Sequence, residues 1–114
     1  MIRRAGKPIV RRTLADADVL DAIDHYRAES STAALGFIDA LETVYAHIQR
    51  APATGSPRYA QALNLPGLRF WACTKYPYLV FYLEHAEHID VWRVLHARRD
   101  IPSWLQDDAA GPAE

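Results

Sequence analysis

The sequence is poor in the residues that build covalent, metal-binding or phosphate-binding scaffolds. Its 114 residues include one cysteine, Cys73, and five glycines. A single cysteine excludes an intramolecular disulfide framework and a cysteine-only zinc site, and with no signal-peptide pattern it favours a reducing, cytoplasmic location. The scattered glycines form no phosphate-binding loop or nucleophile elbow, and no apolar run approaches the roughly 20 residues of a membrane span. We therefore expect no cofactor, no nucleotide-dependent catalysis and no contact with a membrane.

An excess of positive charge is also missing. Lysine and arginine together number 13 and aspartate and glutamate 14, so the formal net charge is −1 at pH 7. Because proteins that bind nucleic acid usually carry a strongly basic face, we expect no direct binding of nucleic acid by this chain alone. The length suits one domain over residues 1–114. Its core should cover about residues 8–105, with a frayed tail at 106–114.

The first segment with a recognisable pattern predicts a strand that leads into a helix. Residues 8–14 are short and partly β-branched, and Pro8 favours a strand at the edge of a sheet. Thr13 is followed three residues later by Asp16, which fits the capping signature of a helix start. One apolar stripe at helical spacing, formed by Val19, Ile23 and Tyr26 with Leu20 beside them, then predicts a helix over 15–29.

A second and stronger helical period follows a polar break at residues 29–32. Apolar side chains recur at three- and four-residue steps as far as Ile48. The helix should end near Arg50, because Pro52 cannot continue the hydrogen-bond ladder and disfavours helical geometry in the residue before it. A break this short predicts an antiparallel helical hairpin.

The carboxyl-terminal half predicts a long connection and then a sheet. Residues 51–66 are rich in turn formers, and connections of this length are often functional. Runs at 68–75, 78–84 and 89–96 are strand-like and are separated by hairpin-sized breaks, which predicts an antiparallel meander. The middle run is apolar throughout, as in a central strand covered on both faces, and residues 100–105 could add a helical turn. The whole chain therefore predicts an α+β fold with both helices packed on one face of the sheet.

Several basic side chains of this half could share one surface, because they come from neighbouring predicted strands or strand ends. Gathered in a concavity, such cations and a histidine could bind RNA phosphate and, with a general base and acid, cleave RNA by attack of the 2′-hydroxyl. Alternatively, they pair with acids of the same half or of a partner chain. Both interpretations apply to one set of residues: Arg69, Lys75, Arg93, His96, Arg98 and Arg99.

Two other reactive groups have a simpler structural explanation. His85 and His88 are three residues apart, but they lie in a predicted turn, where this spacing does not place both rings on one face. No metal site is therefore expected. Cys73 lies in a strand pattern and is interpreted as a small buried apolar residue.

Three segments taken together resemble the toxins of the RelE/ParE superfamily. They are residues 65–69, 76–82 and 91–100, and the resemblance extends over about residues 8–105. The ParE branch is the better match, through the sequences Leu-Pro-Gly-Leu-Arg, Pro-Tyr-Leu-Val-Phe-Tyr and Arg-Val-Leu-His-Ala-Arg-Arg-Asp. The order of one strand, two helices and three strands is also that of the superfamily.

The resemblance implies the toxin of a bacterial type II toxin–antitoxin system. A ParE-like toxin has no catalytic residues: it inhibits growth by binding DNA gyrase, and a ParD-like antitoxin neutralises it. The alternative is a metal-independent ribonuclease of the RelE branch that cleaves ribosome-bound mRNA, with Arg69, Lys75, Arg93, His96 and Arg98 as its catalytic set. Tyr78 and Trp104 stand near positions where the ribonucleases tend to have a basic residue and a tail tyrosine or histidine, and neither replacement can do that chemistry.

Aromatic and arginine side chains are the candidate contacts with these partners. Large aromatics are typical interface anchors, and arginines can hold carboxylates, although the same aromatics could belong to the core. The expected antitoxin contacts are Arg58, Tyr59, Arg69, Trp71, Trp92 and Arg93, with Tyr26 and Tyr45 as further aromatic candidates. The expected target contacts are Arg98, Arg99 and Trp104.

Overall fold

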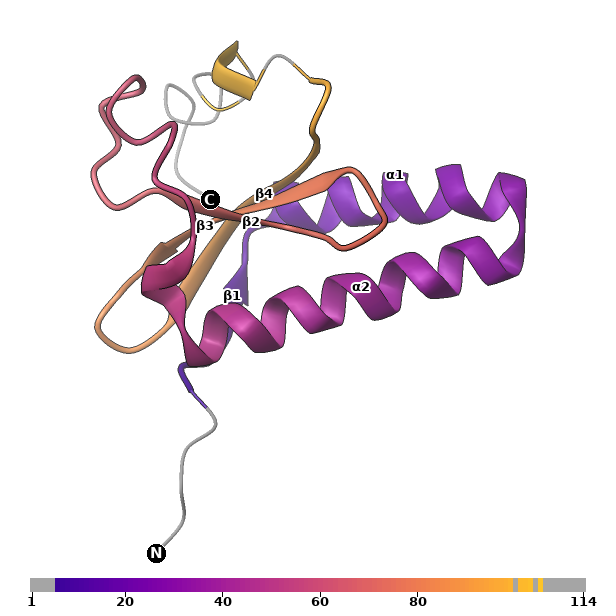
Figure 1. The fold of residues 1–114 in the computed structure, drawn as a ribbon, viewed down its shortest axis with the longest axis horizontal. Coiled ribbons are helices and arrows are strands. Elements are labelled where there is room, and N and C mark those ends of the chain that lie inside the picture. The colour runs from indigo at the N-terminus through magenta and orange to yellow at the C-terminus, as the bar shows by residue number, and fades with distance from the viewer. Residues whose placement is uncertain (1–5, 100, 104, 106–114) are drawn as a thin grey trace, which may run out of the picture.

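The computed structural model describes residues 6–99, 101–103 and 105. Two long helices form a hairpin against one side of a small sheet, and the far end of the hairpin extends beyond the sheet (Figure 1). No helix in this part of the chain is long and apolar enough to cross a bilayer. The elements in chain order are β1 (Ile9–Arg11), α1 (Thr13–Glu29), α2 (Ser31–Arg50), the 3-10 helix η1 (Pro52–Thr54), β2 (Arg69–Ala72), β3 (Tyr78–Glu84) and β4 (Ile89–His96).

The strands form one mixed sheet in the order β1-β4-β3-β2. β2, β3 and β4 are antiparallel neighbours, as the predicted meander requires. β1 lies parallel to β4, with Ile9 opposite Ile89, because the helical hairpin carries the chain back across the sheet before β2 begins. The α+β class and the packing of both helices on one face are confirmed.

The start of α1 differs from the sequence prediction. β1 ends at Arg11, and Thr13 is already helical instead of capping the helix. Arg12 occupies the cap position, and its side chain makes no capping hydrogen bond. Its guanidinium is instead directed to the carboxylate of Asp90 on β4, at 3.0 and 3.1 Å. A long-range ion pair therefore replaces the expected local cap.

The turn between the helices is tighter than predicted, since Ser30 alone joins them. Its backbone N–H donates to the Tyr26 carbonyl at 3.0 Å, and its Oγ accepts from the backbone N–H of Ala33 at 3.0 Å. The same residue thus ends α1 and caps α2. α2 ends at Arg50 as predicted, and Pro52 opens the 3-10 turn that follows.

β2 is shorter than the predicted run 68–75. It ends at Ala72, and Lys75 adopts a φ of 72° in the turn towards β3, a conformation that interrupts an extended strand. The turn brings Tyr76 onto the helices, with its ring centroid 5.1 Å from that of Tyr26 and 5.9 Å from that of Phe37. Tyr26 is thereby a core residue and not an exposed anchor.

The main core lies between the helices and the sheet, and Cys73 is one of its buried members, as predicted. Burial raises the pKa of the Cys73 thiol to about 11, so the thiol is uncharged and unreactive at neutral pH. The larger members of this core are Tyr26, Phe37, Leu41, Val44, Ile48, Val80, Tyr82, Val91 and Val94.

A second core covers the other face of the sheet. Residues 101–103 are helical, and the buried side chains of Ile101 and Leu105 pack with Phe81 of β3 and with half-buried residues of the connection before β2. The prediction that the middle strand is covered on both faces is therefore confirmed, as is the helical turn after β4. The tail expected to fray, residues 106–114, lies outside the described residues.

Candidate functional site

An apolar groove of about 460 Å³ lies between α1 and α2. We call it the helix groove. Its walls are mostly aliphatic, and one of them includes Leu20, whose surface is 62% exposed. Such a concave apolar surface on a small protein is typical of a binding site. The lining residues are Arg11, Asp16, Val19, Leu20, Ile23, Ile38, Leu41, Glu42 and Tyr45.

The groove lies beside the buried side of α1. The buried positions of this helix are Ala15, Ala22 and Tyr26, whereas Val19 and Ile23 are only partly buried against the main core and also line the groove. The sequence pattern placed Val19, Ile23 and Tyr26 on one apolar stripe, but it did not show that Val19 and Ile23 also line a groove. The available signal was that α1 has more large apolar residues than a single buried stripe needs.

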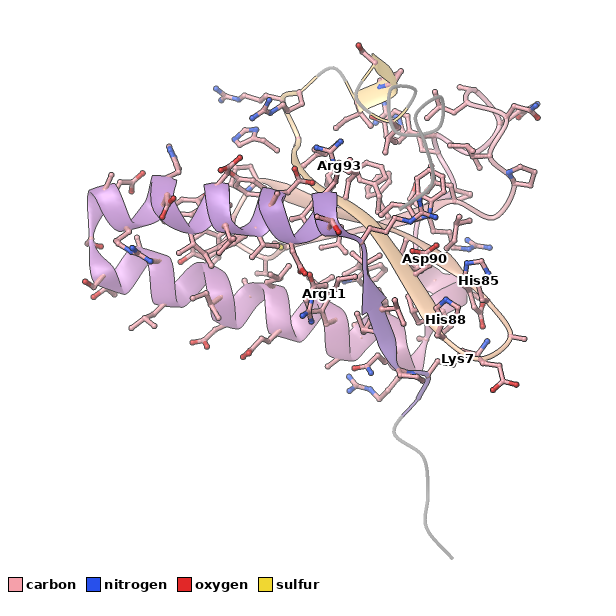
Figure 2. All side chains as sticks on the ribbon, turned by 180° about the vertical axis from the view of Figure 1, so that it is seen from behind. Lys7, Arg11, His85, His88, Asp90 and Arg93 are labelled. Carbon is pink, nitrogen blue, oxygen red and sulfur yellow. The ribbon has the colours of Figure 1, made fainter. Side chains whose placement is uncertain are left out.

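A polar atom without a partner lies beneath the lining of the groove. The hydroxyl oxygen of Tyr45 is buried and has no hydrogen-bond partner among the described residues. Burial raises the pKa of Tyr45 to about 12, so the phenol stays protonated at neutral pH. Arg11 and Asp16 form an ion pair of 2.7 Å in the same lining, and Figure 2 shows Arg11 at the start of α1 beside the gap between the helices.

Four of the six expected antitoxin contacts lie at or near the surface, on β2 and the connection before it. Arg58 is exposed, and its guanidinium carbon lies 5.4 Å from the ring centroid of Tyr59. Tyr59 is half-buried against Phe70 and Phe81.

The two contacts expected on β2 itself are half-buried and already engaged within the chain. Arg69 donates to the carbonyl of Gly55 at 2.8 Å. Trp71 stacks on the ring of His47, with 3.9 Å between the ring centroids. Each keeps part of its surface open, so a partner could still reach it at this edge of the sheet.

The remaining two expected contacts, Trp92 and Arg93, point into the protein and are only 7% and 5% exposed. Arg93 makes a two-pronged ion pair with Asp18 of α1, at 2.7 and 2.8 Å, and Figure 2 shows Arg93 between α1 and β4. All residues of β4 from Ile89 to Leu95 are buried, because this strand lies inside the sheet between the two cores. A bulge also shifts its register at this point. Phe81 pairs with Arg93 but Tyr82 pairs with Val91, so Trp92 is an extra residue in β4. The alternation visible in the sequence does not reveal this shift.

Trp92 belongs to a buried polar cluster around Asp90. The Asp90 carboxylate accepts hydrogen bonds from Arg12 and from Nε1 of Trp92 at 3.2 Å, and Nε2 of His85 lies 3.4 Å away. Burial alone would raise the pKa of Asp90, but the hydrogen bonds and charge of Arg12, with those from His85 and Trp92, outweigh it and lower the pKa. His85 and His88 stack near the β3–β4 turn beside Asp90 (Figure 2). The cluster joins the start of α1 to β4.

This cluster predicts a defined loss of stability in acid. Because the pKa of Asp90 is lowered by folding, its contribution is complete above the unfolded value of about 3.9 and is lost as the pH falls through the folded value. We expect the free energy of unfolding, measured by urea titration, to decline below about pH 4. Asp90→Asn removes the titrating group, so the variant should be less stable at neutral pH but should lose less stability on acidification. Equal acid losses in both proteins would contradict this assignment.

The cations that could have formed a ribonuclease site are dispersed. A pocket at the end of β4 is lined by His25, Tyr78, His96, Arg98 and Arg99. Of the six predicted residues, five cations and a histidine, the described part of the chain brings only His96, Arg98 and Arg99 into this lining. Arg69 and Lys75 lie elsewhere on β2 and its turn, and Arg93 is paired with Asp18.

His96 is poorly suited to act as a base in this pocket. Burial, and then the charges of Arg98 and Arg99, lower its pKa, so the ring is neutral at pH 7. Its Nδ1 accepts the backbone N–H of Arg98 at 3.0 Å. A neutral imidazole with Nδ1 as acceptor carries its proton on Nε2, which leaves no lone pair for proton abstraction on the other side of the ring.

Comparison with known proteins identifies the family. A sequence model described as the ParE toxin of the type II toxin–antitoxin system parDE matches residues 9–101. The chain belongs to the ParE toxin family. Among solved structures, a chain from the "Chromosomal ParDE TA system from P. aeruginosa" superposes with a TM-score of 0.67 at 18% sequence identity, covering 83% of this chain and 100% of that chain. At this identity the likeness shows a shared fold alone. No curated relative matches the chain.

The residues expected to contact the target of this ParE toxin follow the end of β4. Arg98 and Arg99 are exposed and line the β4-end pocket. Trp104, the third expected target contact, lies outside the described residues. The described part of the expected target surface is therefore one edge of the pocket at His96.

Proposed function

We propose that this ParE toxin inhibits DNA gyrase by binding it, without catalysis, and that a ParD-like antitoxin neutralises the toxin by laying an amphipathic helix in the helix groove. The observation that carries the proposal is the contrast between the helix groove and the pocket at the end of β4. The groove is open and apolar, whereas the cations needed for RNA cleavage are dispersed and Arg93 is paired with Asp18. Gyrase as a target would place the toxin in the cytoplasm.

The groove suits an amphipathic helix because its aliphatic walls have a charged rim. Val19, Leu20 and Ile38 can receive apolar side chains spaced at helical intervals. Asp16 and Glu42 at the rim outnumber Arg11, so a basic face on the partner helix would be favoured.

The antitoxin would continue from the groove towards the edge formed by β2. Arg58 and Arg69 could hold carboxylates there, and Tyr59 and Trp71 could add apolar contact. We assign Trp92 and Arg93 a supporting role instead, since both are buried and hold β4 against its neighbours.

Gyrase would be contacted at a different surface, the one that follows the end of β4, through Arg98 and Arg99 and also through Trp104. Arg98 and Arg99 are exposed and share a pocket with half-buried Tyr78, and arginine and tyrosine side chains are common at interface hot spots. Because this surface differs from the helix groove, one substitution can separate loss of toxicity from loss of neutralisation.

Purified toxin should inhibit supercoiling by gyrase and leave ribosome-bound mRNA intact when both are assayed in parallel. Charge reversal in the double variant Arg98→Glu/Arg99→Glu should weaken gyrase inhibition by about tenfold or more, as expected for loss of an arginine hot spot. Arg27→Glu, on an exposed position of α1 with 67% of its side chain open, is the matched control and should inhibit like wild type. Cleaved message with normal supercoiling would overturn the proposal and return His96 and the sheet arginines to a catalytic role.

A further inference from the structure

The unpartnered hydroxyl of Tyr45 is the feature that the fold of the free toxin does not explain. Among the described residues, it is a buried side-chain oxygen with no donor or acceptor in reach. A buried polar atom left unpaired destabilises the protein that contains it. Phenylalanine would fill nearly the same volume without this loss of stability. The hydroxyl therefore has no role in folding that the structure explains, and a role in binding would account for it.

The position of Tyr45 suits contact with a partner docked in the helix groove. Its side chain packs on the main core and also lines the helix groove, between aliphatic residues and the Arg11–Asp16 pair. That pair is about half exposed, with 49% and 52% of the two side chains open, and a partner can displace an exposed ion pair at little cost. The hydroxyl oxygen itself is buried beneath the groove surface, so a partner would reach it by displacing that ion pair.

We propose that Tyr45 determines the specificity of the helix groove, by hydrogen bonding through its Oη to an uncharged amide or hydroxyl side chain of the docked antitoxin helix. The inference rests on the proposed function, because it requires the antitoxin to occupy this groove. A phenol can both donate and accept, which matches an asparagine or glutamine amide. A carboxylate is disfavoured by Asp16 and Glu42, and an ammonium group would lose its hydration among the aliphatic walls.

Tyr45 would discriminate between partners mainly by excluding the wrong ones. An antitoxin with an apolar side chain at this point would leave the hydroxyl buried and unpaired in the complex as well. A site built to hydrogen-bond a partner group rejects an analogue that lacks the group, because its own polar atom then stays unsatisfied. Related antitoxins with similar apolar patterns would therefore be distinguished at one position.

The test is Tyr45→Phe, with two readouts that should move in opposite directions. Urea unfolding of the free toxin should show equal or greater stability, because an unpaired buried hydroxyl is removed. Affinity for the ParD-type antitoxin encoded with this toxin, measured by calorimetry, should fall by about tenfold or more. Tyr76→Phe removes the same atom from a half-buried tyrosine outside the groove lining and should leave the affinity unchanged.

A double-mutant cycle identifies the partner group. Each asparagine, glutamine, serine and threonine of the antitoxin helix is replaced by an apolar residue and tested against both toxins. One replacement should weaken binding to wild type but not to Tyr45→Phe. Unchanged affinity of Tyr45→Phe would overturn the inference while leaving groove docking intact. Full affinity of a toxin whose groove is blocked by Leu20→Glu would instead overturn the docking itself.

Discussion

Replacing Asp18 by alanine should destabilise the toxin by about 3–5 kcal/mol, the usual cost of breaking a buried ion pair from one side. Asp18 holds both Nε and Nη2 of Arg93, at 2.7 and 2.8 Å, and the Arg93 side chain is only 6% exposed. Without the carboxylate, the buried guanidinium loses two charge-assisted hydrogen bonds. Since a domain of this size is stable by about 5–15 kcal/mol, the variant should lie near the limit of folding at 37 °C.

Asp16→Ala is the matched control, because Asp16 lies on the same helix and also binds an arginine at 2.7 Å. Asp16 and its partner Arg11 are about half exposed, so we expect a loss of about 1 kcal/mol or less. Urea unfolding followed by circular dichroism measures both variants. The shortest ion-pair distance is 2.7 Å in both cases, but the Asp18 pair is buried and has a second hydrogen bond to its arginine, whereas the Asp16 pair is half exposed and has one. Similar losses would show that burial of the Asp18–Arg93 pair does not govern its contribution.

The large effect expected for Asp18 also reflects the shape of the sheet. β1 accompanies β4 only as far as Arg11 opposite Val91, so β4 has an open edge beyond that point. The carboxylate of Asp18 accepts the backbone N–H of Val94 there, at 3.0 Å. One side chain of α1 thereby takes the place of the missing strand partner, and Asp18→Ala should expose this edge as well.

Features that depend on local pattern were predictable from the sequence. The period of α2 and its end before Pro52 follow from apolar spacing and proline chemistry, and the bounds of β3 and β4 follow from apolar runs between turn residues. Features set by distant contacts were not predictable. Arg12, and not the predicted Thr13, occupies the cap position of α1, and its side chain binds Asp90, 78 positions away in the chain. No local pattern indicates this pairing.

The candidate site illustrates the same division. The resemblance pointed to the right family, but two of its six antitoxin contacts, Trp92 and Arg93, are buried because β4 is an inner strand covered by side chains on both faces. The helix groove was missed because Val19 and Ile23 share the helical period of Tyr26. Periodicity shows that a helix has an apolar side. Only the packed structure shows that the sheet covers part of that side and leaves the rest in the groove.

Leu20→Glu should lower the affinity of the toxin for its antitoxin by about a hundredfold or more, since an ionised carboxylate would have to be buried among aliphatic side chains. Its charge would also add to those of Asp16 and Glu42 at the rim. The free toxin should be almost unaffected, because Leu20 is 62% exposed and substitutions at such positions usually change stability by about 0.5 kcal/mol or less. In cells, the variant should remain poisonous when the antitoxin is co-expressed.

Leu35→Glu separates groove blocking from a general effect of added charge. Leu35 is 63% exposed, lies on the same hairpin and is absent from the groove lining, so the two substitutions are equal in chemistry and exposure and differ only in place. We expect the antitoxin to bind and neutralise Leu35→Glu like wild type. Calorimetry with purified proteins and growth with both genes expressed provide independent readouts. If the two variants bound the antitoxin equally well, the antitoxin would have to dock outside the groove. Its principal contacts would then be exposed Arg58 and half-buried Tyr59, Arg69 and Trp71.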